Sequence, residues 1–326
     1  MNKLLARFGL DWFLIAIIIM VIMARYFPAL GLMQEPVSLE ELANYGVSCI
    51  FFFYGLKLSA DKLKNGLLNW RMHVVVQLTT FLLFPVLVLV VKPLFGTDDL
   101  KNLWLGVFYL AALPSTVSSS VVMVSIARGN VPAAIFNASI SSLLGIFITP
   151  LWVGLFISAD TGGLDTWSVI GKLCLQVLLP LIIGMLLNPR YGKYADRYKT
   201  PLKFFDQSII LIIIYTSFCK SFSLHLFDDL SVSEVLLLMA GLLGFFFLVI
   251  FITRLIAGAL KFNMEDTITL MFCGSKKSLV HGTVMSKVLF ANSPAAGIVL
   301  LPLMLYHALQ LIAASVMAQR LEKRPQ

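Results

Sequence analysis

The chain has 326 residues, of which 59% are hydrophobic and 13% are charged. Soluble globular domains carry about 25% charged residues, so this composition excludes an ordinary soluble protein and indicates one that lies in a lipid bilayer. The formal net charge is +8. The basic residues stand mainly in short connections between apolar runs, as membrane topology requires, which argues against nucleic acid as a partner.

Apolar runs predict ten transmembrane helices. Runs such as 12–23, 74–91, 235–252 and 295–317 are long enough, or nearly so, to cross about 30 Å of hydrocarbon as helices. They do not alternate apolar with polar residues, as barrel strands would, so we expect an all-α polytopic membrane protein. The expected helices are 11–27, 42–60, 70–91, 102–127, 131–157, 167–188, 204–222, 233–260, 265–290 and 294–319. The longest polar connection is expected at 188–199.

The basic residues are divided unequally between the two sides of the predicted membrane. One side has only Arg25, Lys92, Lys101, Lys220 and Lys287, whereas most of the others fall on the opposite side. Because cytoplasmic loops carry the excess of Lys and Arg, we expect both termini in the cytoplasm, as an even number of helices requires. Short loops and the lack of a cleavage site after the first apolar run favour a bacterial inner membrane protein.

A repeated motif predicts two halves of five helices each. Asn130-Val-Pro-Ala-Ala134 opens the fifth expected helix and Asn292-Ser-Pro-Ala-Ala296 opens the tenth. Each motif follows a helix that polar residues interrupt. Because five is odd, the second half (163–326) enters the membrane from the side opposite to the first (1–162), which makes an inverted repeat typical of secondary transporters.

The ninth expected helix contains two adjacent lysines, Lys276 and Lys277. A charged residue at the bilayer centre costs about 2.5–3.5 kcal/mol, so the pair costs about 5–7 kcal/mol. Lys276 lies about eleven residues from the nearer helix end, or about 16 Å, which is too deep for easy escape to the headgroups. With Gly274, Ser275 and Ser278, these residues predict an unwound segment, which is tolerated only inside protein or beside a wet cavity.

The fourth expected helix is interrupted by Pro114, which cannot donate a backbone hydrogen bond. Hydroxyl groups that could satisfy the freed carbonyls or coordinate a cation follow it, among them Ser118, Ser119 and Ser120. If both helices break at the same depth, their positive N-terminal ends attract a carboxylate and their exposed carbonyls attract a cation. We therefore predict a substrate or ion site where they cross.

Other polar residues in the apolar segments are open to two interpretations. Gln77 and Asn137 form either an interhelical hydrogen bond or part of the lining of the site. His281 and Phe272 are further lining candidates, although buried histidines more often serve packing. No nucleophile–base pair and no metal-ligand pattern is present in the sequence, so we expect neither an enzyme nor a metal site.

Four motifs resemble the bile acid:sodium symporter family, and within it the subgroup of solute carrier family 10 member 7 and related bacterial proteins. They are Ala127-Arg-Gly-Asn-Val131, Ser139-x-Ser-Ser-Leu-Leu-Gly-Ile-Phe147, Phe272-Cys-Gly-Ser-Lys-Lys-Ser-Leu279 and Leu301-Pro-Leu-Met304. The resemblance implies a panel domain (1–66 and 163–226) and a core domain (67–162 and 227–326). It also implies that the fourth and ninth helices unwind and cross in the core.

The chain departs from this family at its sodium ligands. Sodium-coupled members carry Glu-x-Gly-x-Gln-Asn-Ser, where this chain has Phe272 at the carboxylate position and Lys276 and Lys277 at the amide positions. Sodium needs oxygen ligands, so a lysine ammonium is expected to replace the ion. A desolvated lysine also gives up its proton more readily, which favours proton-coupled or uncoupled transport over sodium symport. Alternatively, the pair binds an anionic substrate directly.

The sequence therefore predicts a secondary active transporter of an organic anion that works by alternating access, without a resident cofactor. The alternative is a membrane regulator or sensor that keeps this fold without moving a solute.

Overall fold

The computed structural model describes residues 12–35, 38–57, 69–95, 100–160, 171–172, 174–228, 230–291 and 293–324. Within these ranges, every regular element is a helix. Six helical segments of the described chain are long and apolar enough to cross a membrane: Trp70–Val91, Val131–Phe156, Cys174–Arg197, Lys199–Ser223, Val232–Ala259 and Ala296–Glu322. The expectation of an all-α integral membrane protein is confirmed, whereas the total of ten spans stays a prediction.

The elements of the first half are α2 (Trp12–Tyr26), α3 (Pro28–Leu32), α4 (Leu39–Lys57), α6 (Trp70–Leu78), the π-helical turn η2 (Thr79–Leu83), α7 (Phe84–Val91), the 3₁₀ turn η3 (Lys92–Phe95), α8 (Lys101–Ala112), α9 (Ser118–Ile126) and α10 (Val131–Asp160). Those of the second half are the π-helical turn η5 (Cys174–Leu178), α12 (Leu179–Arg197), α13 (Lys199–Ser223), α14 (Val232–Ala259), α15 (Met264–Ser275), α16 (Leu279–Leu289) and α17 (Ala296–Glu322).

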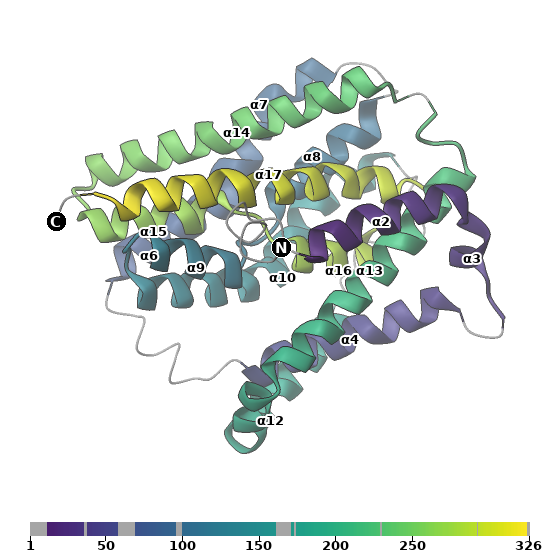
Figure 1. Ribbon diagram of the computed structural model, residues 1–326, viewed down its shortest axis with the longest axis horizontal. Helices are drawn as coiled ribbons and strands as arrows, with labels where there is room; N and C mark the ends of the chain where they lie inside the picture. Colours follow the sequence, from purple (N-terminus) through teal and green to yellow (C-terminus); the bar gives the residue numbers. More distant parts are fainter. Residues whose placement is uncertain are drawn as a thin grey trace.

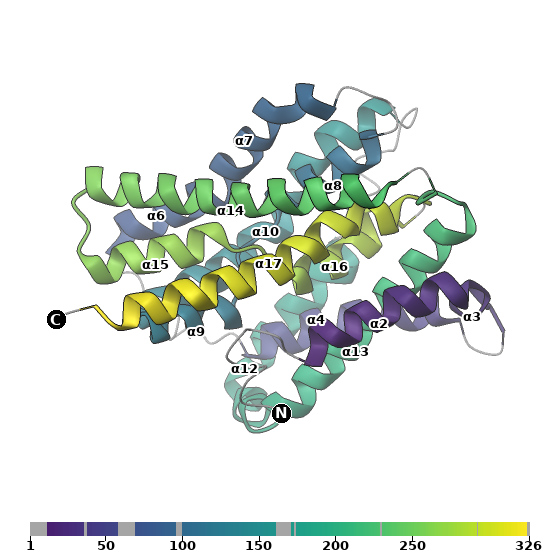
Figure 2. The same cartoon turned by 45° about the horizontal axis from the view of Figure 1, so that its top comes forward.

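The helices pack in two groups (Figures 1 and 2). The smaller group contains α2, α3, α4, α12 and α13, and the larger contains α6 to α10 and α14 to α17. The main packing between the groups is that of α13 against α16 and α17. Within the smaller group, α4 and α12 meet at Gly55 and Gly184, where an added Cβ would collide with the backbone of the other helix. Small residues permit such close approach of membrane helices.

The prediction of a polar connection at 188–199 is wrong. Helix α12 continues through Pro189 to Arg197, and only Tyr198 separates it from α13. Packing against α4 explains this extension, because the Asn188 side-chain amide donates a 2.7 Å hydrogen bond to the carbonyl of Leu56. The loss of one backbone donor at a proline is tolerated when neighbouring helices compensate.

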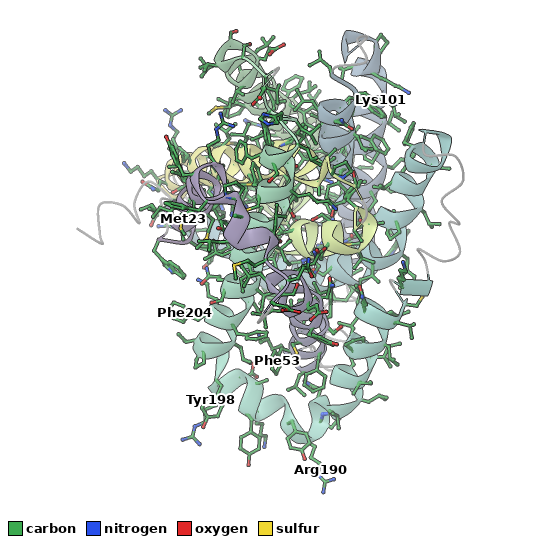
Figure 3. The ribbon with its side chains drawn as sticks, turned by 90° about the vertical axis from the view of Figure 1, so that its right-hand side faces the viewer. Met23, Phe53, Lys101, Arg190, Tyr198 and Phe204 are labelled. Atoms are coloured by element: carbon green, nitrogen blue, oxygen red, sulfur yellow. The ribbon has the colours of Figure 1, made fainter. Side chains whose placement is uncertain are left out.

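Figure 3 places a few of the polar side chains at the periphery of the molecule. Arg190 and Tyr198 point away from the body at the end opposite to Lys101 (Figure 3). At the end of α17, Arg324 donates to the carbonyl of Arg128, a residue that the sequence assigns to the same side. The division of the basic residues between two sides of a membrane, and the orientation of those sides in the cell, stay predictions.

Candidate functional site

Both interruptions predicted from the sequence are present, and they are buried. The first separates α8, which ends at Ala112, from α9, which begins at Ser118. The second separates α15, which ends at Ser275, from α16, which begins at Leu279. Backbone torsions at Leu113, Lys276 and Ser278 are extended. Each long apolar segment is therefore two half-helices joined by a few extended residues.

Each broken helix donates hydrogen bonds to backbone carbonyls of the other. The backbone N–H of Ser278 donates to the carbonyl of Pro114 at 3.0 Å. In the opposite direction, the Ser115 hydroxyl donates to the carbonyl of Cys273 at 2.6 Å, and the Ser120 hydroxyl donates to that of Phe272 at 3.3 Å. A buried backbone group without a partner costs free energy. The crossing therefore supplies the hydrogen bonds that unwinding removes.

Lys277 places its ammonium group among three backbone carbonyls. Its Nζ donates to the carbonyls of Thr80 at 2.7 Å, Ala111 at 2.6 Å and Leu113 at 2.8 Å. The ring of Phe84 lies beneath it, 4.1 Å from Nζ to the centroid. All three donors of the ammonium are used, although the side chain is 0% exposed.

The sequence explains why these carbonyls are free. Ala111 and Leu113 stand where α8 ends, so their carbonyls lack the partners that a continued helix would provide. Thr80 lies in η2, five residues before Pro85, which has no N–H to offer to a π-helical acceptor. Two separate backbone irregularities therefore converge on one cation.

Lys276 is equally buried but has a different environment. Its side chain is 0% exposed, and its ammonium has no hydrogen-bond partner in the part of the chain that the structure describes. Cys273 and His307 lie within electrostatic range of it. The three donors of this ammonium thus remain available to a ligand.

Helix α17 holds the unwound segment of the ninth helix in place. The side-chain amide of Gln310 accepts from the N–H of Lys277 and donates to its carbonyl, both at 2.8 Å. The Tyr306 hydroxyl donates to the carbonyl of Ser275 at 2.7 Å. Sequence reasoning missed these two residues. Gln310 was detectable as an isolated amide inside the apolar run 295–317.

The predicted serines lie at the crossing with mostly local bonds. Ser275 donates to the carbonyl of Met271, and Ser278 caps α16 by accepting from the N–H of His281. Ser119 shares a hydrogen bond with the hydroxyl of Thr116. The side chain of Ser118 lies outside the described residues.

The further lining candidates separate into distinct roles. Gln77 donates to Asn137, which joins α6 to α10 and matches the interhelical alternative. The ring of His281 packs edge-on against Phe51 and Tyr54 of α4, with centroids 6.0 Å and 5.3 Å away. Phe272 is fully buried and takes part in the crossing through its carbonyl.

Comparison with known proteins decides the family. The model of the SBF-like CPA transporter family matches residues 11–323. The chain belongs to this family. An uncharacterized Pseudomonas aeruginosa protein is 42% identical over 318 residues, which cover 98% of this chain and 95% of the relative. YfeH of Escherichia coli, which carries a provisional symporter name, is 37% identical over 97% of this chain and 94% of its own.

A mammalian relative of this SBF-like transporter has a functional name. Sodium/bile acid cotransporter 7 of Mus musculus is 33% identical over 322 residues, which cover 97% of this chain and 93% of the relative. The resemblance drawn from the four motifs is therefore confirmed. In this SBF-like transporter, the crossing holds two chemically distinct ammonium groups. The donors of Lys277 are occupied by carbonyls, whereas those of Lys276 have no partner in the described ranges.

Proposed function

We propose that the protein is a secondary active transporter of an organic anion and works by alternating access. Membership of a transporter family and two half-helix pairs that cross in the protein interior support this proposal. In transporters, substrate sites commonly lie where discontinuous helices meet. The most direct support comes from the Lys276 ammonium, which has no hydrogen-bond partner among the described residues, because a buried cation without a counter-charge attracts an anion.

The moving parts that we propose are the panel (1–66 and 163–226) and the core (67–162 and 227–326), built from inverted halves 1–162 and 163–326. The two packing groups support this division, because the panel would contain α2, α3, α4, α12 and α13. The boundary near 162 lies outside the described residues. We place the ten-span protein in a bacterial inner membrane with both termini in the cytoplasm.

Lys277 is, in this proposal, a built-in cation that takes the place of sodium. Backbone carbonyls are suitable ligands for a monovalent cation, and three of them already bind the ammonium. Phe272 also stands at the crossing position where the resemblance leads us to expect a carboxylate. Sodium coupling is therefore disfavoured, and a proton is the favoured coupling ion if transport is coupled.

Lys276 is the group that we assign to the transported anion or to a coupled proton. Ser275, Ser278, Ser119 and Ser120 lie at the same crossing and offer hydroxyls to a ligand. Ser118 stays a predicted member of this group. Binding there needs a rearrangement that opens the site, because Lys276 is fully buried in this conformation. Alternating access provides such a rearrangement.

Uptake into proteoliposomes tests the proposal. Candidate anions come first from a thermal-shift screen of the purified protein, since a ligand selective for the native state raises its stability. We expect uptake of a hit to be independent of a sodium gradient and to be lost in Lys276→Met, with Lys193→Met as an exposed control. Sodium-dependent uptake that persists in both Lys276→Met and Lys277→Met would refute the assigned roles.

A further inference from the structure

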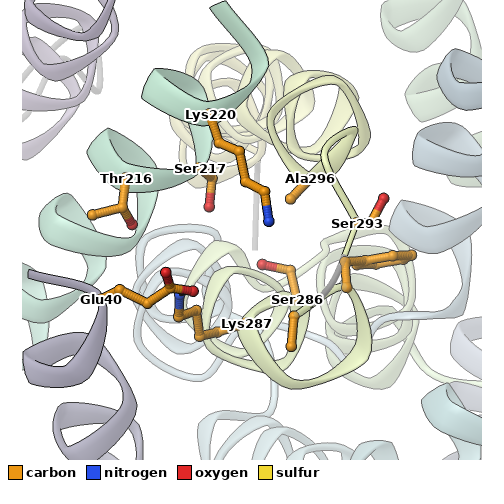
Figure 4. A pocket seen from close by; sticks show the side chains of 10 residues that line it. Glu40, Thr216, Ser217, Lys220, Ser286, Lys287, Ser293 and Ala296 are labelled. Atoms are coloured by element: carbon orange, nitrogen blue, oxygen red, sulfur yellow. The ribbon is translucent and has the colours of Figure 1, made fainter. Parts of the chain in front are cut away.

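A second group of charged side chains lies in a cleft at the far end of α16. Lys287 stands nine residues after Ser278, or about 13 Å along the helix from the crossing. Glu40 of α4 and Lys220 of α13 line the same cleft (Figure 4). The cleft has a volume of about 30 Å³, which is room for about two water molecules or for one carboxylate group.

Lys287 is held by a single carboxylate. Its Nζ lies 2.7 Å from the Oε1 of Glu40, and this is its only hydrogen bond within the described ranges. The Lys287 side chain is 8% exposed, whereas that of Glu40 is 47% exposed. The ammonium of Lys287 is therefore nearly buried and uses one donor among the described residues. The carboxylate of Glu40 is exposed enough for another anion to replace it.

Lys220 faces the same space from the opposite wall (Figure 4). It acts electrostatically on Glu40 but forms no ion pair within 4 Å among the residues described. Two ammonium groups thus face one carboxylate, which leaves one positive charge. The hydroxyl of Ser217, which also lines the cleft, has no hydrogen bond in the described part of the chain. The wall consequently offers donors of both charged and neutral kinds.

We propose that this cleft binds the carboxylate group of an organic anion between Lys220, Lys287 and Ser217, in competition with Glu40. The apolar remainder of the ligand extends out of the cleft, past Phe290 and Ala291. Binding also displaces Glu40 from Lys287. This breaks the ion pair that joins α4 of the smaller helix group to α16 of the larger one. The site is separate from the crossing, so its occupancy can be measured without transport.

Binding of benzoate to the purified full-length protein in lipid nanodiscs tests this site. All variants carry Lys276→Met, which removes the ammonium proposed to bind an anion at the crossing. Benzoate bound by these variants therefore reports on the cleft alone, and a negative result there leaves the proposed transport function untouched. We expect benzoate to bind, Lys220→Gln and Lys287→Gln each to weaken it at least about tenfold, and Glu40→Gln to strengthen it. Lys193→Gln, on the exposed face of α12, is the matched control.

Benzamide, which has the same ring without the charge, is the control ligand. Its binding is expected to be undetectable at the concentrations that saturate with benzoate. Equal benzoate affinity in the Lys220→Gln, Lys287→Gln and Lys193→Gln variants would overturn the proposal, as would benzamide binding as tightly as benzoate.

Discussion

At the residue scale, the free energy of a buried ammonium depends on whether its donors are used. Lys276 and Lys277 are adjacent and both 0% exposed. The ammonium of Lys277 replaces its lost hydration with three carbonyls and a ring. That of Lys276 has no such compensation among the described residues. A buried polar group without a partner is retained against its cost mainly where it serves a function.

Methionine substitutions should therefore change the free energy of unfolding in opposite directions. Lys276→Met removes an uncompensated ammonium and should stabilise the protein by about 1–3 kcal/mol. Lys277→Met leaves three carbonyls unpaired and should destabilise it by about 2–5 kcal/mol. Unfolding of the two purified variants in one detergent measures both. Shifts of the same sign in both variants would show that the two environments are not different.

The sequence identified these two lysines through their insertion cost but could not assign a role to each. The roles depend on carbonyls from Thr80, Ala111 and Leu113, which are more than 160 residues away along the chain. Every residue type has a backbone carbonyl, so the sequence does not show which carbonyls will bind the ammonium. The same limit applies to Tyr306, whose hydroxyl finds its acceptor only in the folded protein.

At the scale of elements, each broken helix stabilises the other. Ser115 is the best example, because its hydroxyl donates to the carbonyl of Cys273 of α15 while its N–H donates to the hydroxyl oxygen of Ser141 of α10. One residue thus connects three segments. These bonds tie the interruption after α8 to both α15 and α10.

Ser115→Ala should lower the free energy of unfolding by about 1–3 kcal/mol, because it leaves the buried carbonyl of Cys273 without this donor. Ser139→Ala is the matched control, since the half-buried Ser139 bonds, among the described residues, only to the carbonyl of Ile135 in its own helix. We expect the control to stay within about 0.5 kcal/mol of the wild type. Chemical unfolding in mixed micelles compares the two, and an equal effect of both substitutions would contradict the bridging role.

The interruptions of both helices were predictable because Pro114 and the Lys276–Lys277 pair each break a local rule. The continuation of α12 to Arg197 was not predictable in this way. Pro189 and the polar residues around it indicate a connection locally, and only packing on α4 keeps them helical. Local sequence preference gives way where a neighbouring helix supplies the compensating contact.

At the scale of the whole molecule, the two helix groups meet mainly through α13. Gly297 of α17 lies against Ser221 of α13, where an added Cβ would be 3.1 Å from the Ser221 Cβ. Disulfides join Cβ atoms about 3.5–4.5 Å apart. A cystine between these positions therefore needs a shift of only a few tenths of an ångström.

The double variant Ser221→Cys with Gly297→Cys should lose uptake when oxidised and regain it when reduced, because alternating access requires the groups to move against each other. The four native cysteines, all free in the structure, are replaced by alanine beforehand. Proteoliposome uptake with and without reductant measures the effect, and each single cysteine variant serves as a control. Undiminished uptake by the fully oxidised double variant would argue against motion at this contact.

The fold class was predictable from composition and from the length of the apolar runs. The arrangement of the two helix groups came instead from family resemblance, because hydropathy says where a helix spans but not which helix it contacts. The Lys220–Lys287 cleft was also hidden, since its charged residues come from α4, α13 and α16 and look like ordinary surface charges in the sequence.

Sodium binding at equilibrium tests the central claim, that the ammonium of Lys277 occupies the cation position of the crossing. The unfolding temperature of the purified protein is followed while sodium chloride replaces choline chloride at constant ionic strength. We predict no sodium-specific shift for the wild type. A saturable stabilisation that reaches about 2.7 kcal/mol at 100 times the dissociation constant, and that is unchanged in Lys277→Met, would contradict the claim.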